Sequence, residues 1–252
     1  MKFLFMIIII YSCSCEEDRK PSKYEITKWG EAEYKNIHRA SCVVAGANVT
    51  GSCVAISPRH ILTAAHVVVS SPENTYAIFS YGADEKEEID CDFSGYKNIN
   101  CLNDAIAINY HPDYIRGKFH DDLAIITLKW DLSHYKNLSD RPFYPPEEWA
   151  YPIPNEIVTS FGYGLSDSGE NDLRLRIGPN IIGDYIGHGI SIFGDREIRA
   201  GDSGGGAVNS SDQLVVMFSH KSNIGDGVVV NVAMVPVLYR KWAEGVIKGK
   251  AN

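Results

Sequence analysis

Short apolar runs separated by turn residues fill the chain from Ser41 onward. The runs are rich in Val, Ile, Phe and Tyr, and Gly, Pro, Asn or Asp interrupts them about every ten residues, as is typical of strands joined by turns. In the first half, the predicted strands are residues 42–44, 53–56, 76–79, 106–109 and 123–128. In the second half, they are residues 157–161, 173–177, 189–193, 207–208, 214–219 and 228–232. This pattern predicts an all-β fold built from antiparallel barrels or a sandwich.

Helical periodicity is scarce until the end of the chain. After Pro236, residues 237–248 carry apolar side chains at helical spacing and predict a C-terminal helix. The proline-rich residues 141–154 predict a crossing between two halves. We therefore divide the chain into a first half, residues 26–140, and a second half with the C-terminal helix, residues 155–252.

The first residues have the features of an export signal. A basic residue is followed by an apolar run, residues 3–10, which is too short to span a bilayer, and then by small or polar residues. We interpret residues 1–15 as a signal peptide or a lipoprotein signal and residues 16–25 as a tether or propeptide. In the lipoprotein interpretation Cys13 carries a lipid anchor, with Cys15 as the second candidate. The first interpretation predicts a secreted protein, and the second a lipid-anchored protein of a bacterial envelope.

Length and charge narrow the function classes. The roughly 230 residues after the signal can bury a sizeable core, as one compact unit or two small barrels. The formal net charge is −8, the isoelectric point is near 5.5, and the sequence has no cluster of Lys and Arg. This balance argues against a nucleic-acid partner and offers no basic face for a membrane surface.

Four cysteines follow the signal, and an exported chain can oxidise them. Cys42, Cys53, Cys91 and Cys101 allow three pairings by sequence alone. We favour Cys42–Cys53 and Cys91–Cys101, because each pair flanks a predicted turn. A zinc site is the alternative, but the spacings lack a C-x-x-C pair, so we expect no metal.

A glycine-rich run marks the first candidate for chemistry. Residues 199–206 contain four glycines around one Asp-Ser pair. Glycine permits positive φ and close approach of the backbone, so the run predicts a tight turn that presents Ser203 beside bare N–H groups. Acyl transfer requires this arrangement, because a serine hydroxyl needs a base and the oxyanion needs donors already aimed at it. A surface loop and a phosphate cradle are the alternatives.

Two further stretches contain the groups that such a serine needs. His66 lies within the apolar run 61–68, and by itself it is typical of a buried core histidine. Asp122 stands at the entry to the predicted strand 123–128, where a carboxylate is commonly a turn residue. Together with Ser203, the histidine offers a base that works near neutral pH, and Asp122 offers an anion to orient it.

These motifs resemble those of the trypsin and chymotrypsin family. Residues 63–66 (Thr-Ala-Ala-His), 122–125 (Asp-Leu-Ala-Ile) and 201–205 (Gly-Asp-Ser-Gly-Gly) resemble its histidine, aspartate and serine motifs, in the family's order. Residues 111–114 and 158–162 are weaker matches, and the resemblance covers almost all of the chain from about residue 26. It implies two antiparallel Greek-key β-barrels packed face to face, the first over residues 26–140 and the second, with a C-terminal α-helix, over residues 155–252.

The resemblance also implies a role for each residue. Ser203 attacks the substrate carbonyl, His66 takes and returns the proton, and Asp122 holds the imidazole in the useful tautomer. The N–H groups of Gly201 and Ser203 form the oxyanion hole. Asp121 is the alternative carboxylate, but the family motif has an aliphatic residue directly after its aspartate, which favours Asp122. No cofactor is expected.

The chain departs from the family at its disulfides and at its cleft. Val67 stands where vertebrate members have a cysteine, and no cysteine lies near Ser203 in the sequence. The strand that pairs with the substrate backbone reads Ser219, His220 and Lys221 in place of Ser-Trp-Gly. We expect these three residues to bind substrate, with Lys221 narrowing the cleft.

Substrate preference is predicted to depend on Glu197. This residue lies six positions before the nucleophile, where an aspartate in the family selects Lys or Arg on the acyl side of the cut bond. A carboxylate in a partly dry pocket favours a cationic side chain, because pairing offsets the cost of burying either charge. The alternative is that Glu197 faces solvent and is neutralised by Arg199.

Activation is the second departure of interest. In the family, a newly freed N-terminal ammonium of Ile or Val pairs with the aspartate beside the serine, which is Asp202 in this chain. Ile26 falls near the expected position, but Glu25 precedes it where a basic residue is usual. We hypothesise that an internal partner satisfies Asp202 and that activity needs no cleavage after residue 25.

The sequence therefore predicts an exported trypsin-like serine endopeptidase that acts on proteins or peptides, with protein inhibitors as further partners. A catalytically silent homologue that acts as a binding protein is one alternative; the complete set of catalytic residues argues against it, and the altered cleft argues for it. An esterase of the α/β-hydrolase type is the other, and the order of the motifs and the scarcity of helices argue against it.

Overall fold

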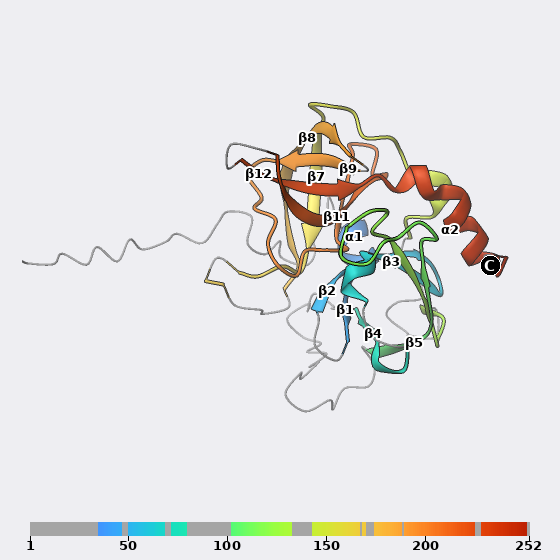
Figure 1. Ribbon diagram of the computed structural model, residues 1–252. Coiled ribbons are helices and arrows are strands. Elements are labelled where there is room, and N and C mark those ends of the chain that lie inside the picture. The colour runs from blue at the N-terminus through green and yellow to red at the C-terminus, as the bar shows by residue number, and fades with distance from the viewer. Residues whose placement is uncertain are drawn as a thin grey trace, which may run out of the picture.

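The computed structural model describes residues 35–46, 50–68, 72–79, 102–132, 143–166, 168–169, 174–187, 189–224 and 228–250. Within these residues the chain forms two closed β-barrels of six strands each, one coloured blue to green and the other yellow to red in Figure 1. This is the predicted all-β, chymotrypsin-like architecture. The esterase hypothesis is wrong about the scaffold, because an α/β-hydrolase needs a largely parallel, helix-covered sheet and the strand pairs here are antiparallel.

The first barrel contains strands β1 to β6 in the order β1-β2-β3-β6-β5-β4, closed by β4 on β1. Their bounds are β1 (Ser41–Ala45), β2 (Thr50–Ser57), β3 (His60–Thr63), β4 (Tyr76–Ile78), β5 (Leu102–Tyr110) and β6 (Ala124–Leu128). Consecutive residues such as Ile125 and Ile126 are both fully buried. Since successive side chains of a strand point to opposite faces, β6 is covered on both faces, which explains its continuous apolar run.

The second barrel repeats this order as β10-β11-β12-β9-β8-β7. Its strands are β7 (Ile157–Gly162), β8 (Arg176–Ile186), β9 (Gly189–Phe193), β10 (Gly206–Val208), β11 (Leu214–Asn223) and β12 (Val229–Met234). Its fully buried side chains include Phe161, Phe218 and Tyr163. Burial of such large apolar side chains is the main favourable contribution to folding, at about 25 cal/mol per Å² of apolar surface.

A disulfide links Cys42 and Cys53, as predicted, across the neighbouring strands β1 and β2. The two residues are direct partners in the strand register, with their Cα atoms 4.9 Å apart. The predicted partners Cys91 and Cys101 lie outside the described residues, as do the export signal, the tether and Ile26.

Several elements differ from the sequence-based prediction. Strand β3 was not predicted, because its four residues merge with the apolar run that leads to His66. Strand β8 starts at Arg176 and continues to Ile186, well beyond the predicted residues 173–177. A short helix, α1 (Lys35–Ala40), precedes β1 without a clear signal in the sequence.

The predicted C-terminal helix is present and shorter than expected. Proline at the start of η7 (Pro236–Tyr239) fits a first turn, and this 3-10 turn leads directly into α2 (Arg240–Ile247). Ala243 and Val246 are the buried residues of α2, which lies beside the barrels at the right of Figure 1. Among the described residues, no helix has the length and apolar character needed to cross a membrane.

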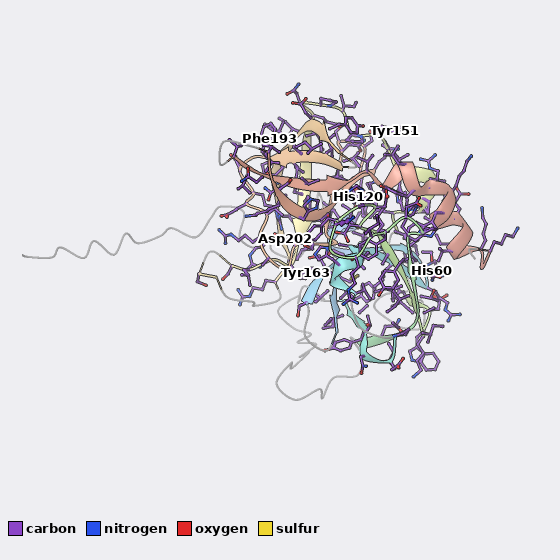
Figure 2. The ribbon with its side chains drawn as sticks, in the orientation of Figure 1. His60, His120, Tyr151, Tyr163, Phe193 and Asp202 are labelled. Atoms are coloured by element: carbon purple, nitrogen blue, oxygen red, sulfur yellow. A yellow bond between two sulfur atoms is a disulfide. The ribbon has the colours of Figure 1, made fainter. Side chains whose placement is uncertain are left out.

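The two barrels meet along direct backbone contacts. The N–H of Ser52 on β2 donates to the carbonyl of Ser203 at 2.8 Å, which connects the first barrel to the loop before β10. The segment between the barrels makes hydrogen bonds to both of them. The main-chain N–H of Tyr144 donates to the carbonyl of Ala55 in the first barrel, and that of Ala150 donates to the carbonyl of Leu214 in the second. Figure 2 shows Asp202, the neighbour of Ser203, in the region between the barrels. The candidate nucleophile therefore lies at their junction.

Candidate active site

His66 and Asp122 are joined by two hydrogen bonds. His66 lies in the 3-10 turn η2 (Ala65–Val67) directly after β3, and Asp122 precedes β6, the strand that pairs with β3. The Nδ1 atom of His66 lies 2.7 Å from Oδ2 of Asp122, and the main-chain N–H of His66 donates to Oδ1 at 2.8 Å. With a carboxylate as its acceptor, Nδ1 carries the hydrogen, which leaves the lone pair on Nε2 for a proton.

Asp122 is completely buried. Burial alone would raise the pKa of this carboxyl, but hydrogen bonds from His66 and Ser219, with the charge of His66, hold the pKa below its ordinary value. The Ser219 hydroxyl donates to the same oxygen, Oδ2, that faces the imidazole. Asp122 is therefore ionised at neutral pH and can orient an imidazole ring.

Ser203 lies in the turn before β10, and its hydroxyl donates to the main-chain carbonyl of Ser219 at 2.9 Å. Ser219 thus contacts two of the predicted catalytic residues, because its own hydroxyl donates to Asp122. Ser203 and His66 are both described, and no hydrogen bond joins them. The structure brings the three predicted residues to one site around Ser219, with the Ser203 hydroxyl directed at Ser219.

The glycines around Ser203 have the backbone geometry that the sequence predicted. Gly201 has a φ of 93° and Gly204 a φ of 88°, values that favour glycine. A Cβ atom on Gly204 would lie 2.1 Å from the carbonyl oxygen of Ser52, so the first barrel approaches the loop too closely for any side chain. The N–H groups of Gly201 and Ser203 have no hydrogen-bond partner among the described residues. Both N–H groups are therefore available to bind an oxyanion.

Ser52, in the first barrel, forms hydrogen bonds that support the loop around Ser203. The sequence did not predict this role. The Ser52 hydroxyl donates to the carbonyl of Gly201 at 2.8 Å and accepts from the N–H of Tyr163 at 2.8 Å. Its own carbonyl accepts from the Thr63 hydroxyl at 2.8 Å. A polar residue inside a strand carries no sequence signal for such a contact, because the partner lies more than a hundred residues away in the chain.

Phe119 lies between His66 and His220. Its ring meets His66 edge-on, with the ring centroids 5.3 Å apart, and stacks on His220 at 4.5 Å. The φ of Phe119 is 52°, which is unusual for a bulky residue and indicates that the surrounding chain enforces this position. One edge of the site is therefore a layer of three rings.

His220 is linked to Asp122 through Ser219. The Nδ1 atom of His220 lies 2.9 Å from the Ser219 hydroxyl oxygen, and because that hydroxyl gives its hydrogen to Asp122, His220 is the donor. Burial lowers the pKa of His220, the negative charge of Asp122 opposes the shift, and His66 adds to it. Lys221 follows on the same strand, exposed and paired in register with Asn231 of β12.

Glu197 has the geometry of the solvent-facing alternative. Its side chain is 63% exposed, and its Oε2 accepts from Nη2 of Arg199 at 2.9 Å and from Nε at 3.2 Å. A carboxylate that is exposed and already paired has little electrostatic attraction left for a substrate cation. The structure therefore favours neutralisation of Glu197 by Arg199 over a buried charge at the base of a pocket.

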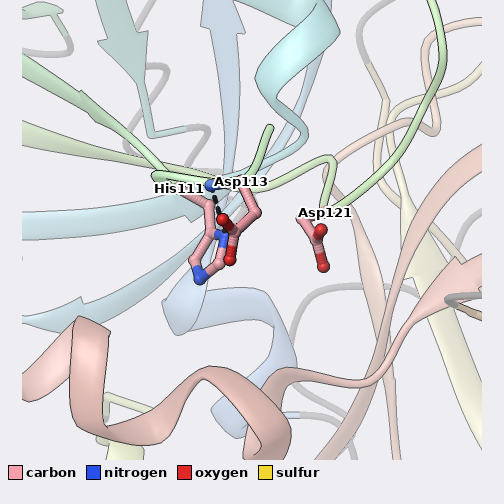
Figure 3. A group of neighbouring side chains, drawn as sticks. All are labelled: His111, Asp113 and Asp121. Atoms are coloured by element: carbon pink, nitrogen blue, oxygen red, sulfur yellow. Dashed lines mark hydrogen bonds between the residues drawn. The ribbon is translucent and has the colours of Figure 1, made fainter. Parts of the chain in front are cut away.

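Asp121, the alternative to Asp122, points to a different neighbour. Its Oδ1 accepts from the Tyr239 hydroxyl at 2.7 Å. His111, Asp113 and Asp121 each offer one atom that could bind a metal ion, and these atoms lie within 4.8 Å of one another (Figure 3). Nδ1 of His111 accepts from the N–H of Asp113 and Oδ1 of Asp121 from Tyr239, and we assign no metal to this cluster.

Comparisons with known proteins agree with this architecture. The family model described as Trypsin matches residues 29–243. Among solved structures, the crystal structure of scabies mite inactivated protease paralogue S-D1 superposes with a TM-score of 0.66 at 16% identity, covering 86% of this chain and 95% of that chain. At this identity the likeness concerns the fold alone. No curated protein matches the sequence.

Proposed function

Because the chain belongs to the trypsin family, as the match over residues 29–243 shows, we propose that it is an active serine endopeptidase. The single observation that carries the proposal is the double hydrogen bond of buried Asp122 to His66, which fixes the orientation and the tautomer of the imidazole ring. Burying a carboxylate is unfavourable, and the need to orient the imidazole of His66 explains why Asp122 is buried here.

The chemistry follows from these positions. Ser203 leaves the Ser219 carbonyl by rotation about χ1 and gives its proton to Nε2 of His66 as it attacks a peptide carbonyl. The imidazolium that forms is stabilised by Asp122, and the oxyanion binds to the N–H groups of Gly201 and Ser203. His66 then donates the proton to the leaving amine, and water repeats the cycle on the acyl-enzyme. Hydrogen bonds of this kind are commonly longer or absent before substrate binds.

A silent homologue remains the second candidate function, on a specific observation. The Ser203 hydroxyl is bonded to Ser219 and not to His66, and the Phe119 ring lies against His66. The scabies mite protein of similar fold is an inactivated protease paralogue. Under this candidate, the site would bind a peptide segment without cleaving it.

Substrates, export and anchoring are part of the proposal. We propose protein or peptide substrates, secretion directed by residues 1–15, and, in the lipoprotein interpretation, an anchor on Cys13. Formation of the Cys42–Cys53 disulfide supports an oxidising compartment. His220 and Lys221 are proposed to contact substrate from β11, next to Ser219.

Labelling with a serine-directed phosphonate tests the proposed function. We expect one adduct, on the peptide that contains Ser203, and a loss of about a million-fold in kcat for Ser203→Ala. The exposed Ser210, on the turn after β10, provides the matched control, and Ser210→Ala should label as the unmodified chain does. A folded chain that takes no label and cleaves no peptide would favour the silent homologue.

A further inference from the structure

Asp202, next to the candidate nucleophile, is buried with its carboxylate fully engaged. Only 1% of the residue is exposed. Its Oδ1 accepts from the N–H of Gly164 at 2.8 Å and from Nη2 of Arg196 at 2.6 Å. Its Oδ2 accepts from the N–H of Arg199 at 2.8 Å. The one ion pair among these contacts is with Arg196, and both side chains of the pair are nearly inaccessible, at 4% and 2% exposure.

Strand β8 and its surroundings hold Arg196 in place. The main-chain N–H of Arg196 donates to the carbonyl of Pro179 and to the side chain of Asn180, and its Nε donates to the carbonyl of Arg176 at 3.2 Å. Its guanidinium also lies over the ring of Phe218, 5.8 Å from the centroid. A guanidinium anchored in this way can act as a fixed support, since little side-chain freedom remains to be lost.

The space around the carboxylate is equally defined. A Cβ atom on Gly162 would lie 2.4 Å from Oδ1 of Asp202, and one on Gly164 would lie 2.4 Å from Oδ2. Two glycines thus make room for the carboxylate at the end of β7, where Gly164 also supplies a hydrogen bond. The space that holds the Asp202 carboxylate therefore lies within the second barrel.

The backbone of Asp202 also makes hydrogen bonds within the loop 199–206, which carries the N–H groups of Gly201 and Ser203. The N–H of Asp202 donates to the carbonyl of Arg199 at 3.0 Å, and its carbonyl accepts from the N–H of Gly205 at 2.8 Å. Asp202 therefore ties residues 199–206 together, with Gly201 on one side and Ser203 on the other. Donors aimed in advance at a developing oxyanion are a large source of catalysis, so the position of Asp202 matters for rate.

We propose that Arg196 is a positioning residue that holds the loop 199–206 through its ion pair with Asp202, so that a chain still carrying residues 16–25 is catalytically competent. This proposal rests on the proposed serine-endopeptidase function. It identifies the internal partner that the sequence could only hypothesise for Asp202. A buried carboxylate without this partner would carry an uncompensated charge, which is why the guanidinium is required.

Substitution of Arg196 tests the support of the loop. Arg196→Met keeps the length and the apolar contacts of the side chain and removes the charge. We expect kcat to fall by about a hundredfold, with KM changing less than about threefold, because the substituted residue does not touch substrate. Asp202→Asn should act in the same direction, and the double variant should lose little more than either single variant, since the two residues act as a pair. Additive losses would overturn the pairing.

A control and a rescue separate positioning from general destabilisation. Arg59 also donates its guanidinium to backbone carbonyls, those of Leu128 and Lys129, and lies in the first barrel, so Arg59→Met should leave kcat unchanged. In Arg196→Ala, millimolar guanidinium chloride should restore activity and equal sodium chloride should not. Failure of this rescue in a variant whose near-UV spectrum shows that it is folded would overturn the role of Arg196.

Two measurements distinguish failure of this proposal from failure of the proposed function. Amide hydrogen exchange of a peptide covering residues 199–206 needs no activity, and it should accelerate in Arg196→Met and not in Arg59→Met. Phosphonate labelling should proceed at the same rate in the chain that begins at Glu16 and in one that begins at Ile26. Labelling of the shorter chain alone would overturn the proposal. Absence of labelling in both, with the exchange difference present, would count against the endopeptidase and support Arg196.

Discussion

The Ser52 hydroxyl donates to the carbonyl oxygen of Gly201 at 2.8 Å, so a strand of the first barrel holds the loop of the second barrel that carries the nucleophile. The same hydroxyl accepts from the N–H of Tyr163, and the N–H of Ser52 donates to the carbonyl of Ser203. One side chain therefore joins three segments that are far apart in the chain. The loop 199–206 is supported from both barrels, by Ser52 on one side and by Asp202 with Arg196 on the other.

Substitution Ser52→Ala should lower both activity and stability. It leaves the N–H of Tyr163 and the carbonyl of Gly201 without their partner, and unsatisfied buried groups cost about 1–3 kcal/mol. We expect kcat on a peptide substrate to fall about tenfold through a less ordered oxyanion loop. Urea unfolding and steady-state kinetics measure the two effects. Ser57→Ala, on the same strand and bonded only to its near neighbours His60 and Arg59, is the control that should keep kcat. An unchanged kcat in Ser52→Ala would show that the loop needs no support from the first barrel.

Substitution Glu197→Ala should change substrate preference little. The side chain is mostly exposed and paired with Arg199, and exposed ion pairs contribute about 0–1 kcal/mol. We therefore expect kcat/KM for peptides with Lys or Arg before the cut bond to change less than about threefold. Profiling a peptide library with both proteins checks this. A selective loss of cleavage after Lys and Arg would instead restore Glu197 as the residue that selects cationic side chains.

Stability should fall as the pH drops below neutral. Burial lowers the pKa of His60, of His111 and of His220 from the ordinary histidine value, and Arg59 adds to the shift at His60. A histidine with a lowered pKa binds fewer protons in the folded state than in the unfolded chain, so its contribution is complete above about pH 6.5 and is lost as the pH falls from there toward the lowered value. Melting temperatures at about pH 7.5 and about pH 5.5 measure the loss.

The variant His220→Gln should show a smaller decrease in melting temperature over this range, because one group that must accept a proton on unfolding is gone. Asp122 has a lowered pKa as well, so the same sign applies to it, but its window lies below the ordinary pKa of aspartate, about 3.9. A melting temperature that rises on acidification toward pH 5.5 would contradict the prediction.

Removal of the Cys42–Cys53 disulfide should destabilise the first barrel. The bridge closes a loop with a sequence separation of 11, for which restriction of the unfolded chain predicts about 2–3 kcal/mol. Urea unfolding of Cys42→Ala/Cys53→Ala under oxidising conditions, against the unmodified chain, measures this difference. Equal midpoints would mean that the ladder between β1 and β2 holds the strands without the bridge.

The sequence by itself determined the fold class and indicated the candidate catalytic residues. Turn residues at short intervals between β-branched runs reflect local backbone preference, so strands such as β6, β7 and β9 could be placed from it. The pairing of Cys42 with Cys53 followed from a turn between them. His66, Asp122 and Ser203 could be chosen because their residue types and neighbours are local features of the chain.

Only the tertiary structure decided how these residues are supported. Arg196 stands in a run of charged residues that a pattern assigns to solvent, yet its guanidinium is buried against Asp202. Ser52 looks like an ordinary strand residue, and its partners at Gly201 and Tyr163 belong to the other barrel. From the sequence Glu197 could face a pocket or solvent, and in the structure its side chain is exposed and paired with Arg199. Local preference ends within a few residues, whereas these contacts depend on how two closed barrels approach each other, which no stretch of the chain encodes alone.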